Sequence, residues 1–228
     1  MLRNLYPSLI VFALAIGGSY VWLQTDRNSP TATDFAVIET LVDVTDVQAT
    51  DADTLEVPEM TLGDADAPVT IIEYASFTCP HCARFHETVF KDIVTNYVDT
   101  GKVQFIMRDV YFDRLGLWAA MLARCEPAKF FGFSDLIYTR QSDWTRADSD
   151  VAVVQNLKTL GRIAGMTDDV MDACLQDSTT AQALVNAYQT NSERDDITST
   201  PSFLINGKKY ANMNYADFAE AIDSLIAE

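Results

Sequence analysis

The stretch SFTCPHCARF, residues 76–85, contains two cysteines separated by a proline and a histidine. Such a pair can bind a metal ion, form a structural disulfide or exchange electrons with other thiols. With Cys79 as the N-cap of a helix, Pro80 takes the first helical position, where its missing N–H costs nothing. Cys82 then lies one turn further along the same face. The two sulfurs can therefore bond without bending the backbone.

The start of a helix favours a negative charge on Cys79. The first N–H groups have no acceptor within the helix, and the helix dipole is positive there, so the thiol pKa falls below its usual value of about 8.5. His81, when protonated, adds a positive charge close by. A stabilised thiolate favours the dithiol form over the disulfide, which becomes an oxidant of other thiols. We therefore predict redox chemistry at Cys79, Pro80, His81 and Cys82.

The two other readings of the pair are weaker. Zinc needs four ligands, yet Cys125 and Cys174 lie 43 and 92 residues beyond Cys82 without a second C-x-x-C, so no metal site is predicted. A purely structural bridge from Cys79 to Cys82 would close too short a loop to add much stability. In an exported chain with an even cysteine count, Cys125 and Cys174 are instead expected to form a structural disulfide, with buried free thiols as the alternative.

The segment before the cysteine pair is predicted to be a central strand. APVTIIEYASF, residues 67–77, is a continuous apolar run of the kind that is covered on both faces. Glu73 interrupts it, and a carboxyl group is costly to bury unless it is neutral, paired or useful. It is either a buried acid that relays a proton to or from Cys82, or a solvated side chain at an edge.

The rest of the chain predicts one sheet interrupted by helices. An apolar stripe after Cys82 indicates a helix ending near Gly101, and the strand that follows should pair in parallel with residues 67–77. The aromatic residues of the insert are expected in the core, with a peptide-binding groove as the alternative; they are Trp118, Trp144, Phe130, Phe131 and Phe133. His86 lies one turn after Cys82 and could approach the active site, but it is expected to be half-exposed at the surface. The remaining expected elements are an edge strand at 56–63, helices over 114–197, a hairpin turning at Asn206-Gly207, and an amphipathic helix over 215–228.

The sequence IIEYASFTCPHC, residues 71–82, followed across the helical insert by ITSTPSFLING, residues 197–207, resembles the DsbA-type thiol-disulfide oxidoreductases of the thioredoxin superfamily. The resemblance covers roughly residues 56–228. It implies an α/β thioredoxin fold, a central mixed sheet flanked by helices, with an inserted all-helical subdomain. The expected domains are a thioredoxin-like domain over 55–113 and 198–228 and the subdomain over 114–197.

The resemblance also assigns roles to individual residues. Cys79 becomes the exposed nucleophile, Cys82 its buried partner and Glu73 the buried acid. Pro201 becomes a cis-proline that faces the disulfide, with Thr200 before it, as substrate-binding residues. The residues alone would favour a trans bond there, because only about 5% of X-Pro bonds in folded proteins are cis.

The N-terminal part of the chain indicates export. Leu5 to Leu23 is an uncharged apolar run long enough to cross a hydrocarbon core of roughly 30 Å. We favour a membrane anchor over residues 1–24, with a cleaved signal peptide as the alternative; both place the bulk of the chain outside the cytoplasm. Residues 25–54 are expected to be an acidic flexible tether, and a net charge of −17 argues against a nucleic-acid partner.

Together these features predict a periplasmic or otherwise extracytoplasmic enzyme that introduces disulfides into reduced exported proteins. It needs no cofactor, is expected to be a monomer and, by resemblance, is recycled by a membrane redox partner of the DsbB type. The alternatives are a disulfide reductase or isomerase of the same fold, or a membrane-anchored peptide-binding scaffold whose disulfide is inert.

Overall fold

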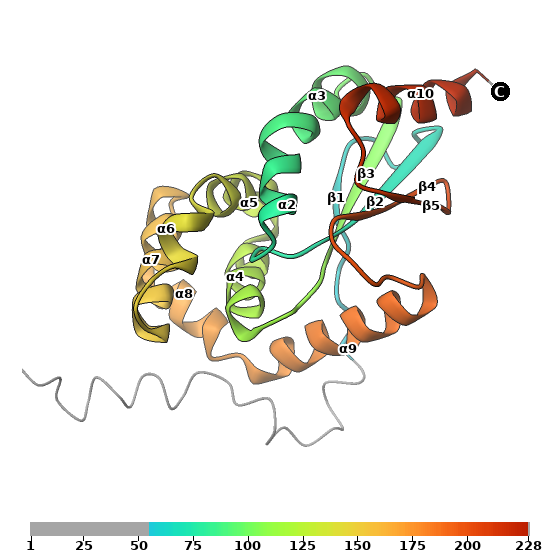
Figure 1. The fold of residues 1–228 in the computed structure, drawn as a ribbon. Coiled ribbons are helices and arrows are strands. Elements are labelled where there is room, and N and C mark those ends of the chain that lie inside the picture. Colours follow the sequence, from blue (N-terminus) through green and yellow to red (C-terminus); the bar gives the residue numbers. More distant parts are fainter. Residues whose placement is uncertain (1–54, 228) are drawn as a thin grey trace, which may run out of the picture.

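The computed structural model describes residues 55–227 of the 228-residue chain, which form a five-stranded mixed sheet with helices packed around it (Figure 1). The strand order is β1-β3-β2-β4-β5. The strands are β1 (Met60–Leu62), β2 (Val69–Ala75), β3 (Val103–Asp109), β4 (Ser202–Ile205) and β5 (Lys208–Ala211). The predicted α/β thioredoxin fold is confirmed.

The central strand β2 holds Glu73 inside the sheet. It pairs in parallel with β3, as the strand-helix-strand order predicted, and antiparallel with β4. Glu73 is in register with Met107 on one side and Phe203 on the other. With strands on both flanks it has no edge position, and its side chain is fully buried. A solvated Glu73 is therefore excluded.

The helix after the cysteine pair runs from α2 to the start of β3 with two wider, π-helical turns. Its segments are α2 (Pro80–Phe85), η2 (His86–Phe90), α3 (Lys91–Ile93) and η3 (Val94–Val98). It ends before Gly101, whose φ of +71° suits glycine in the turn into β3. The chain closes with α10 (Tyr215–Ile226), which lies near the same helix in Figure 1.

A block of helices lies between β3 and β4 in the chain, as the periodicity indicated. Short polar side chains begin four of its helices, for example Asp113 at α4, Ser149 at α7 and Asp177 at α9, where each accepts a hydrogen bond from a first-turn N–H. The helices are α4 (Arg114–Cys125), η4 (Pro127–Lys129), α5 (Phe130–Thr139), α6 (Gln141–Thr145), α7 (Asp150–Ile163), α8 (Asp168–Leu175) and α9 (Ser178–Arg194).

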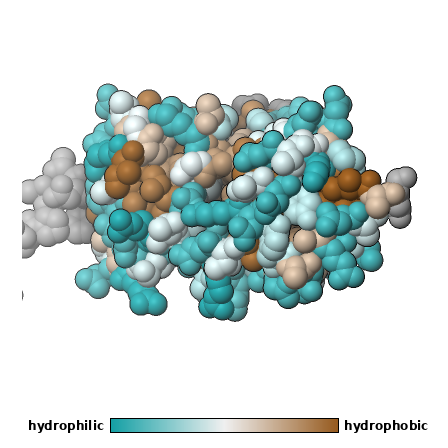
Figure 2. All heavy atoms as spheres, turned by 90° about the horizontal axis from the view of Figure 1, so that it is seen from above, coloured by the Kyte–Doolittle hydropathy of each residue, from teal (hydrophilic) through white to brown (hydrophobic). Residues whose placement is uncertain are grey.

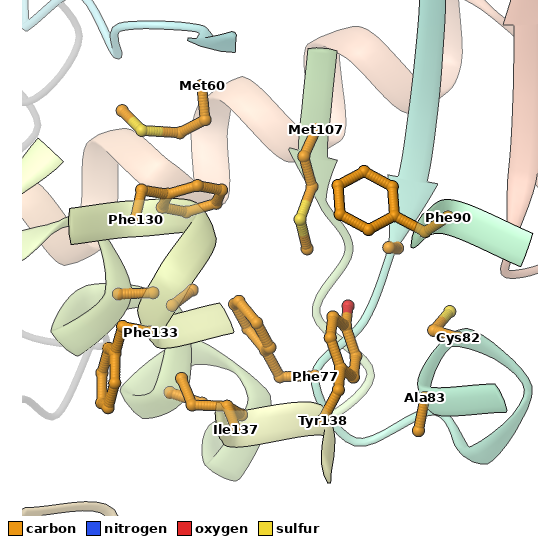
Figure 3. Close-up of a cluster of buried hydrophobic side chains, with 14 of the residues drawn as sticks. Met60, Phe77, Cys82, Ala83, Phe90, Met107, Phe130, Phe133, Ile137 and Tyr138 are labelled. Carbon is orange, nitrogen blue, oxygen red and sulfur yellow. The ribbon is translucent and has the colours of Figure 1, made fainter. Parts of the chain in front are cut away.

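The hydrophobic core is divided by the sheet. The larger part packs side chains of β2, β3 and β4 against α2, α10 and the helical block, and it includes the cluster drawn in Figure 3. Of the predicted core aromatics, Trp118, Trp144, Phe130 and Phe133 are buried there. Phe131 is half-buried and packs against this core. On the opposite face, Tyr74, Val110 and Leu204 form a smaller cluster with Tyr188 from α9.

The sheet ends in a hairpin whose outer strand is polar. Asn206 and Gly207 have φ angles of 45° and 80°, which fits the predicted type I′ turn. On β5, Lys208 and Lys209 are both exposed, and the ammonium of Lys209 lies 3.0 Å from a carboxylate oxygen of Asp196.

The surface in the view of Figure 2 is largely hydrophilic, with hydrophobic atoms in a few separate patches. Among residues 55–227, no helix has both the length and the apolar character needed to cross a bilayer. The predicted anchor over 1–24 and the tether over 25–54 lie outside the described residues and stay predictions.

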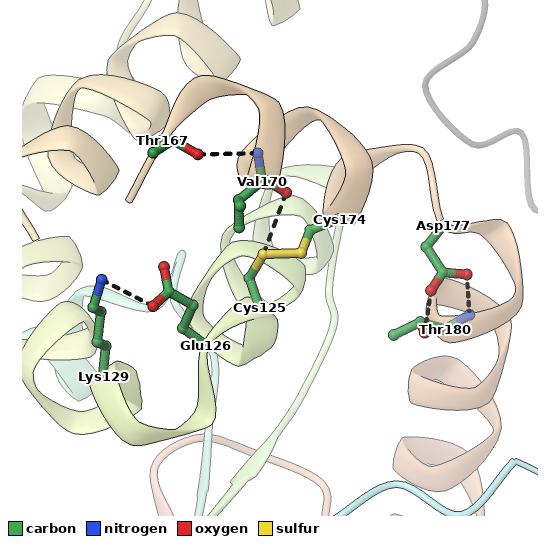
Figure 4. The surroundings of a disulfide bond; sticks show 8 residues. All are labelled: Cys125, Glu126, Lys129, Thr167, Val170, Cys174, Asp177 and Thr180. Atoms are coloured by element: carbon green, nitrogen blue, oxygen red, sulfur yellow. Dashed lines mark hydrogen bonds and ion pairs between the residues drawn. A yellow bond between two sulfur atoms is a disulfide. The ribbon is translucent and has the colours of Figure 1, made fainter. Parts of the chain in front are cut away.

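Cys125 and Cys174 form a disulfide in the structure. It joins the last residue of α4 to α8, with 5.9 Å between the Cα atoms and 49 residues of sequence separation (Figure 4). The two helices also pack against each other. The disulfide therefore links two helices of the same helical block and does not connect that block to the sheet.

We expect removal of this disulfide to destabilise the chain. A closed loop of about 50 residues restricts the unfolded chain by about 4 kcal/mol in the chain-entropy model, and measured effects are commonly about 2 to 4 kcal/mol. Urea unfolding of the Cys125→Ala/Cys174→Ala variant measures the loss. A midpoint equal to that of the wild-type chain would contradict the expectation.

Candidate active site

Cys79 lies where a loop becomes a helix. It is the N-cap of α2 with extended backbone angles, and Pro80 follows at the first helical position, as predicted. The backbone N–H of Cys79 donates to the carbonyl of Ser76, and its own carbonyl accepts from the N–H of Ala83. The side chain of His81 is exposed. The sequence thus places Cys79 at the positive end of the helix.

The surroundings of Cys79 stabilise its thiolate form. Its pKa is lowered from 9.0 to about 5, chiefly because the Cys82 thiol hydrogen-bonds to its sulfur; burial opposes the change. The Thr200 side chain and the backbone N–H groups of Cys82 and His81 lower it further. The expectation of an exposed nucleophile is wrong, because Cys79 is buried, with only 8% of its surface exposed.

Cys82 has the opposite character. Both cysteines are present as thiols, and Cys82 is fully buried. Burial is the main cause that raises its pKa, followed by the hydrogen bond to Cys79 and the negative charge of Glu73. One turn of helix therefore separates a stabilised thiolate from a thiol that resists ionisation.

The Thr200-Pro201 segment faces the cysteine pair from the start of β4. The peptide bond between these residues is cis, as the resemblance implied and against the trans bond that residue statistics favour. The Cys79 sulfur lies 3.5 Å from the carbonyl oxygen of Thr200. Cys79 and Thr200 are 121 positions apart in the chain, and the fold brings them into contact.

Glu73 has a partner that the sequence did not predict. A carboxylate oxygen of Glu73 lies 2.9 Å from Nε2 of His86. The expectation of a surface position for His86 is wrong, because the residue is only 2% exposed and its ring stacks on Tyr138 with 4.3 Å between ring centres. A signal was available: His86 lies four residues after Cys82 and four before Phe90, on the buried stripe of the helix.

Gln141 is a second site residue that no sequence pattern selects. Its side-chain amide donates to the carbonyl of Phe77 at 2.8 Å and to that of Cys79 at 3.0 Å. Gln141 begins α6, so the helical block holds the loop that carries the reactive cysteine. A contact across 62 residues leaves no local pattern in the sequence.

Replacing Gln141 with Leu should loosen this loop. The carbonyl of Phe77 would lose its side-chain donor, which typically costs about 1 to 3 kcal/mol, and the carbonyl of Cys79 would keep only the N–H of Ala83. We expect lower stability in urea unfolding and a slower reaction of Cys79 with iodoacetamide at pH 7. Gln141→Glu has the size of glutamine but replaces the donor with a carboxylate that repels both carbonyl oxygens, so its effects should be at least as large as those of Gln141→Leu. Wild-type behaviour of both variants would contradict this role.

The fold and the site together define a class: a thioredoxin-fold chain with a C-x-x-C pair at a helix start, opposite a cis-proline. Residues 55–224 match the model of the thioredoxin family. The chain belongs to the thioredoxin family.

Two named relatives show the nature of the likeness. A Rickettsia bellii protein, provisionally named a protein-disulfide oxidoreductase, is 31% identical over 172 residues, 75% of this chain and 65% of that protein. Disulfide bond formation protein D of Bacillus subtilis is 27% identical over 175 residues, 73% of this chain and 75% of that protein. The match thus spans slightly less than two thirds of the Rickettsia relative.

A solved structure extends the likeness to three dimensions. Alpha-DsbA1 of Wolbachia pipientis superimposes with a TM-score of 0.70 at 30% identity, covering 78% of this chain and 96% of that one. The resemblance to DsbA-type proteins is therefore confirmed.

Proposed function

We propose that this chain is an extracytoplasmic thiol-disulfide oxidoreductase that introduces disulfide bonds into exported proteins. The observation that carries the proposal is the contrast within the pair, a Cys79 with its pKa lowered to about 5 beside a buried Cys82 with a raised pKa. This contrast stabilises the reduced form, so the oxidised form is a strong acceptor of electrons. The names of the relatives agree with this chemistry.

The exchange proceeds in two steps on the oxidised pair. A substrate thiolate attacks the Cys79 sulfur; the bond to Cys82 breaks, and Cys82 leaves with the electron pair and takes up a proton. The second substrate thiolate then attacks its own chain's sulfur in the mixed disulfide, and Cys79 leaves as a thiolate. The substrate has lost two electrons, and the pair has gained them. Burial of Cys82 directs the first attack to the Cys79 sulfur, because an outside thiolate cannot reach the Cys82 sulfur.

Roles for the neighbouring residues follow from their positions. Thr200 and the cis-Pro201 lie against the Cys79 sulfur, where the main chain of a bound substrate would pass. Glu73 is buried beside Cys82 and interacts with it electrostatically, so it is the proton donor and acceptor that we assign to that sulfur. His81 and Pro80 shape the helix start, and Cys125 and Cys174 brace the helical block.

Two features support export and a membrane partner. The apolar run from Leu5 to Leu23 suits an anchor, and the Cys125–Cys174 disulfide is typical of oxidising compartments. An oxidase must pass its electrons on, and we assign this step to a membrane redox protein of the DsbB type. The substrates are reduced exported proteins, and the chain works as a monomer. Membrane fractionation with alkaline washing tests the anchor, which should stay in the pellet.

The equilibrium reduction potential of the Cys79–Cys82 pair tests the direction of electron flow. The full chain is equilibrated in glutathione buffers, and the oxidised fraction is read by alkylation and mass spectrometry. A value near about −120 mV supports a donor of disulfides. A value near about −270 mV, the range of reductants, would overturn the proposed direction and favour a reductase.

A further inference from the structure

The carboxyl group of Glu73 is held at one oxygen only. Oε2 lies 2.9 Å from Nε2 of His86, whereas Oε1 is buried without a hydrogen-bond partner among the described residues. The side chains are 0% and 3% exposed, so bulk water does not compete for either group. A buried polar atom without a hydrogen-bond partner destabilises the fold, so its presence at a redox site suggests a functional role.

A proton must lie between Glu73 and His86. An unprotonated nitrogen and a carboxylate oxygen would repel each other at 2.9 Å, so either the imidazole or the carboxyl group carries a hydrogen at this contact. The imidazole has little freedom to turn. It stacks on Tyr138, packs against Phe90 at 4.6 Å between ring centres and meets Phe85 edge-on.

The same pocket contains the buried thiol. The charge of Glu73 acts on Cys82, and the Tyr138 hydroxyl responds to the charges of Cys82, Glu73, Asp109 and Cys79. These are the titratable groups that face the pair from β2, β3, α2 and α5. Figure 3 shows Tyr138 beside Phe77, in the same cluster as Cys82.

We propose that His86 is a positioning residue for proton transfer at Cys82: it anchors one oxygen of Glu73 and so leaves the other free to exchange a proton with the Cys82 sulfur. This inference rests on the proposed function and deepens it. His86 touches neither substrate nor sulfur and acts through Glu73. Its part is to fix the carboxyl group by a hydrogen bond from a ring that the aromatic neighbours immobilise.

The role is clearest in the step that forms the Cys79–Cys82 disulfide. When Cys79 is joined to glutathione, Cys82 must lose its proton to Glu73 before its sulfur attacks Cys79. The bond between Cys79 and glutathione then breaks, and glutathione leaves with the electron pair. In the reverse direction the proton returns from Glu73 to the Cys82 thiolate. Both directions need the carboxyl group at the same place.

Stopped-flow mixing of the reduced full chain with oxidised glutathione separates the two events. The first phase depends on glutathione concentration and reports attack by Cys79; the second does not and reports resolution by Cys82. Acid quenching and mass spectrometry identify the mixed disulfide. We expect His86→Leu to slow the second phase about tenfold at pH 7 and to change the first less than about twofold. The effect should be smaller than the roughly 100-fold or greater loss typical of removing a general acid or base itself, because His86 acts only through Glu73.

Conservative variants separate positioning from packing. His86→Gln retains an N–H within reach of Glu73 and should recover most of the rate; the shorter His86→Asn should not. In a Glu73→Leu background, His86→Leu should have almost no further effect, because coupled residues are not additive. Ile222→Val, a core change in α10, controls for a general loss of packing and should leave the second phase unchanged.

Three results would overturn the inference: an unchanged second phase in His86→Leu, equal slowing with and without Glu73, or a Gln variant as slow as the Leu variant. If His86→Leu does not fold, the comparison of Gln with Asn decides. A reducing potential in the wild-type chain would refute the proposed oxidase without affecting these rates. Wild-type rates in all His86 variants would refute the positioning role alone.

Discussion

Cys79→Ser should abolish dithiol exchange, lowering the rate of disulfide formation in a reduced model protein by at least about a thousandfold. The thiolate is the nucleophile and the carrier of the substrate bond, and a serine hydroxyl at the same place does not ionise near neutral pH. The measurement is the appearance of disulfides in reduced, unfolded ribonuclease. A wild-type chain that forms no disulfides above background would support a peptide-binding scaffold with an inert disulfide, and undiminished activity in Cys79→Ser would refute Cys79 as the nucleophile.

Cys82→Ser is the matched companion of this variant. It retains the Cys79 nucleophile but removes the residue that resolves the mixed disulfide within the chain. We expect it to accumulate covalent adducts with glutathione or with reduced substrate, which mass spectrometry detects. Adducts at Cys82 in the Cys79→Ser variant would contradict the assignment, because that sulfur is fully buried.

The reactivity of Cys79 should fall steeply in acid. With a pKa lowered from 9.0 to about 5, nearly all of the thiol is ionised at pH 7, and only about a tenth at pH 4. The rate of reaction with iodoacetamide, corrected with Cys79→Ser, should therefore fall about tenfold between these values. A midpoint near pH 8 to 9 would show that the thiolate is not stabilised.

The stability of the reduced chain should also fall as the pH is lowered, over a wider range than the reactivity. A pKa that is lower in the folded state contributes stability that is complete above the unfolded value, near pH 9, and is lost as the pH falls through about 5. At pH 7 the contribution is on the order of 2 to 3 kcal/mol, and at pH 4 it is nearly absent. Urea unfolding under mild reductant, compared with Cys79→Ser at each pH, isolates it. A difference that does not change with pH would contradict the prediction.

Most of the fold could be predicted from the sequence because the decisive signals are local. Proline after Cys79 marks a helix start, the uninterrupted apolar run around Glu73 marks a central strand, and Asn206-Gly207 marks a tight hairpin. Each of these depends on a few neighbouring residues. The cis bond before Pro201 has no such local signal and came only from the resemblance to a family.

The missed parts of the site depend on tertiary contacts. Gln141 reaches the reactive loop from a helix 62 residues away, and nothing near it in the sequence refers to that loop. His86 was misplaced because histidine is common at surfaces, although its spacing from Cys82 and Phe90 puts it on the buried stripe. That prediction relied on the residue type, although the position on the buried stripe indicated the opposite. The position was the better guide because the buried carboxyl group of Glu73 gives His86 a partner in the core.

The lysines of β5 have a consequence for the proposed function, because reduced clients are unfolded chains. An outer strand with free N–H and C=O groups is a template on which an extended client could add as a further strand and remain bound. Lys208 and Lys209 place positive charge along that edge, which discourages such pairing by any strand of similar charge. Under the proposed function, clients would instead reach the Cys79 sulfur, which lies by Thr200 near the opposite end of β4.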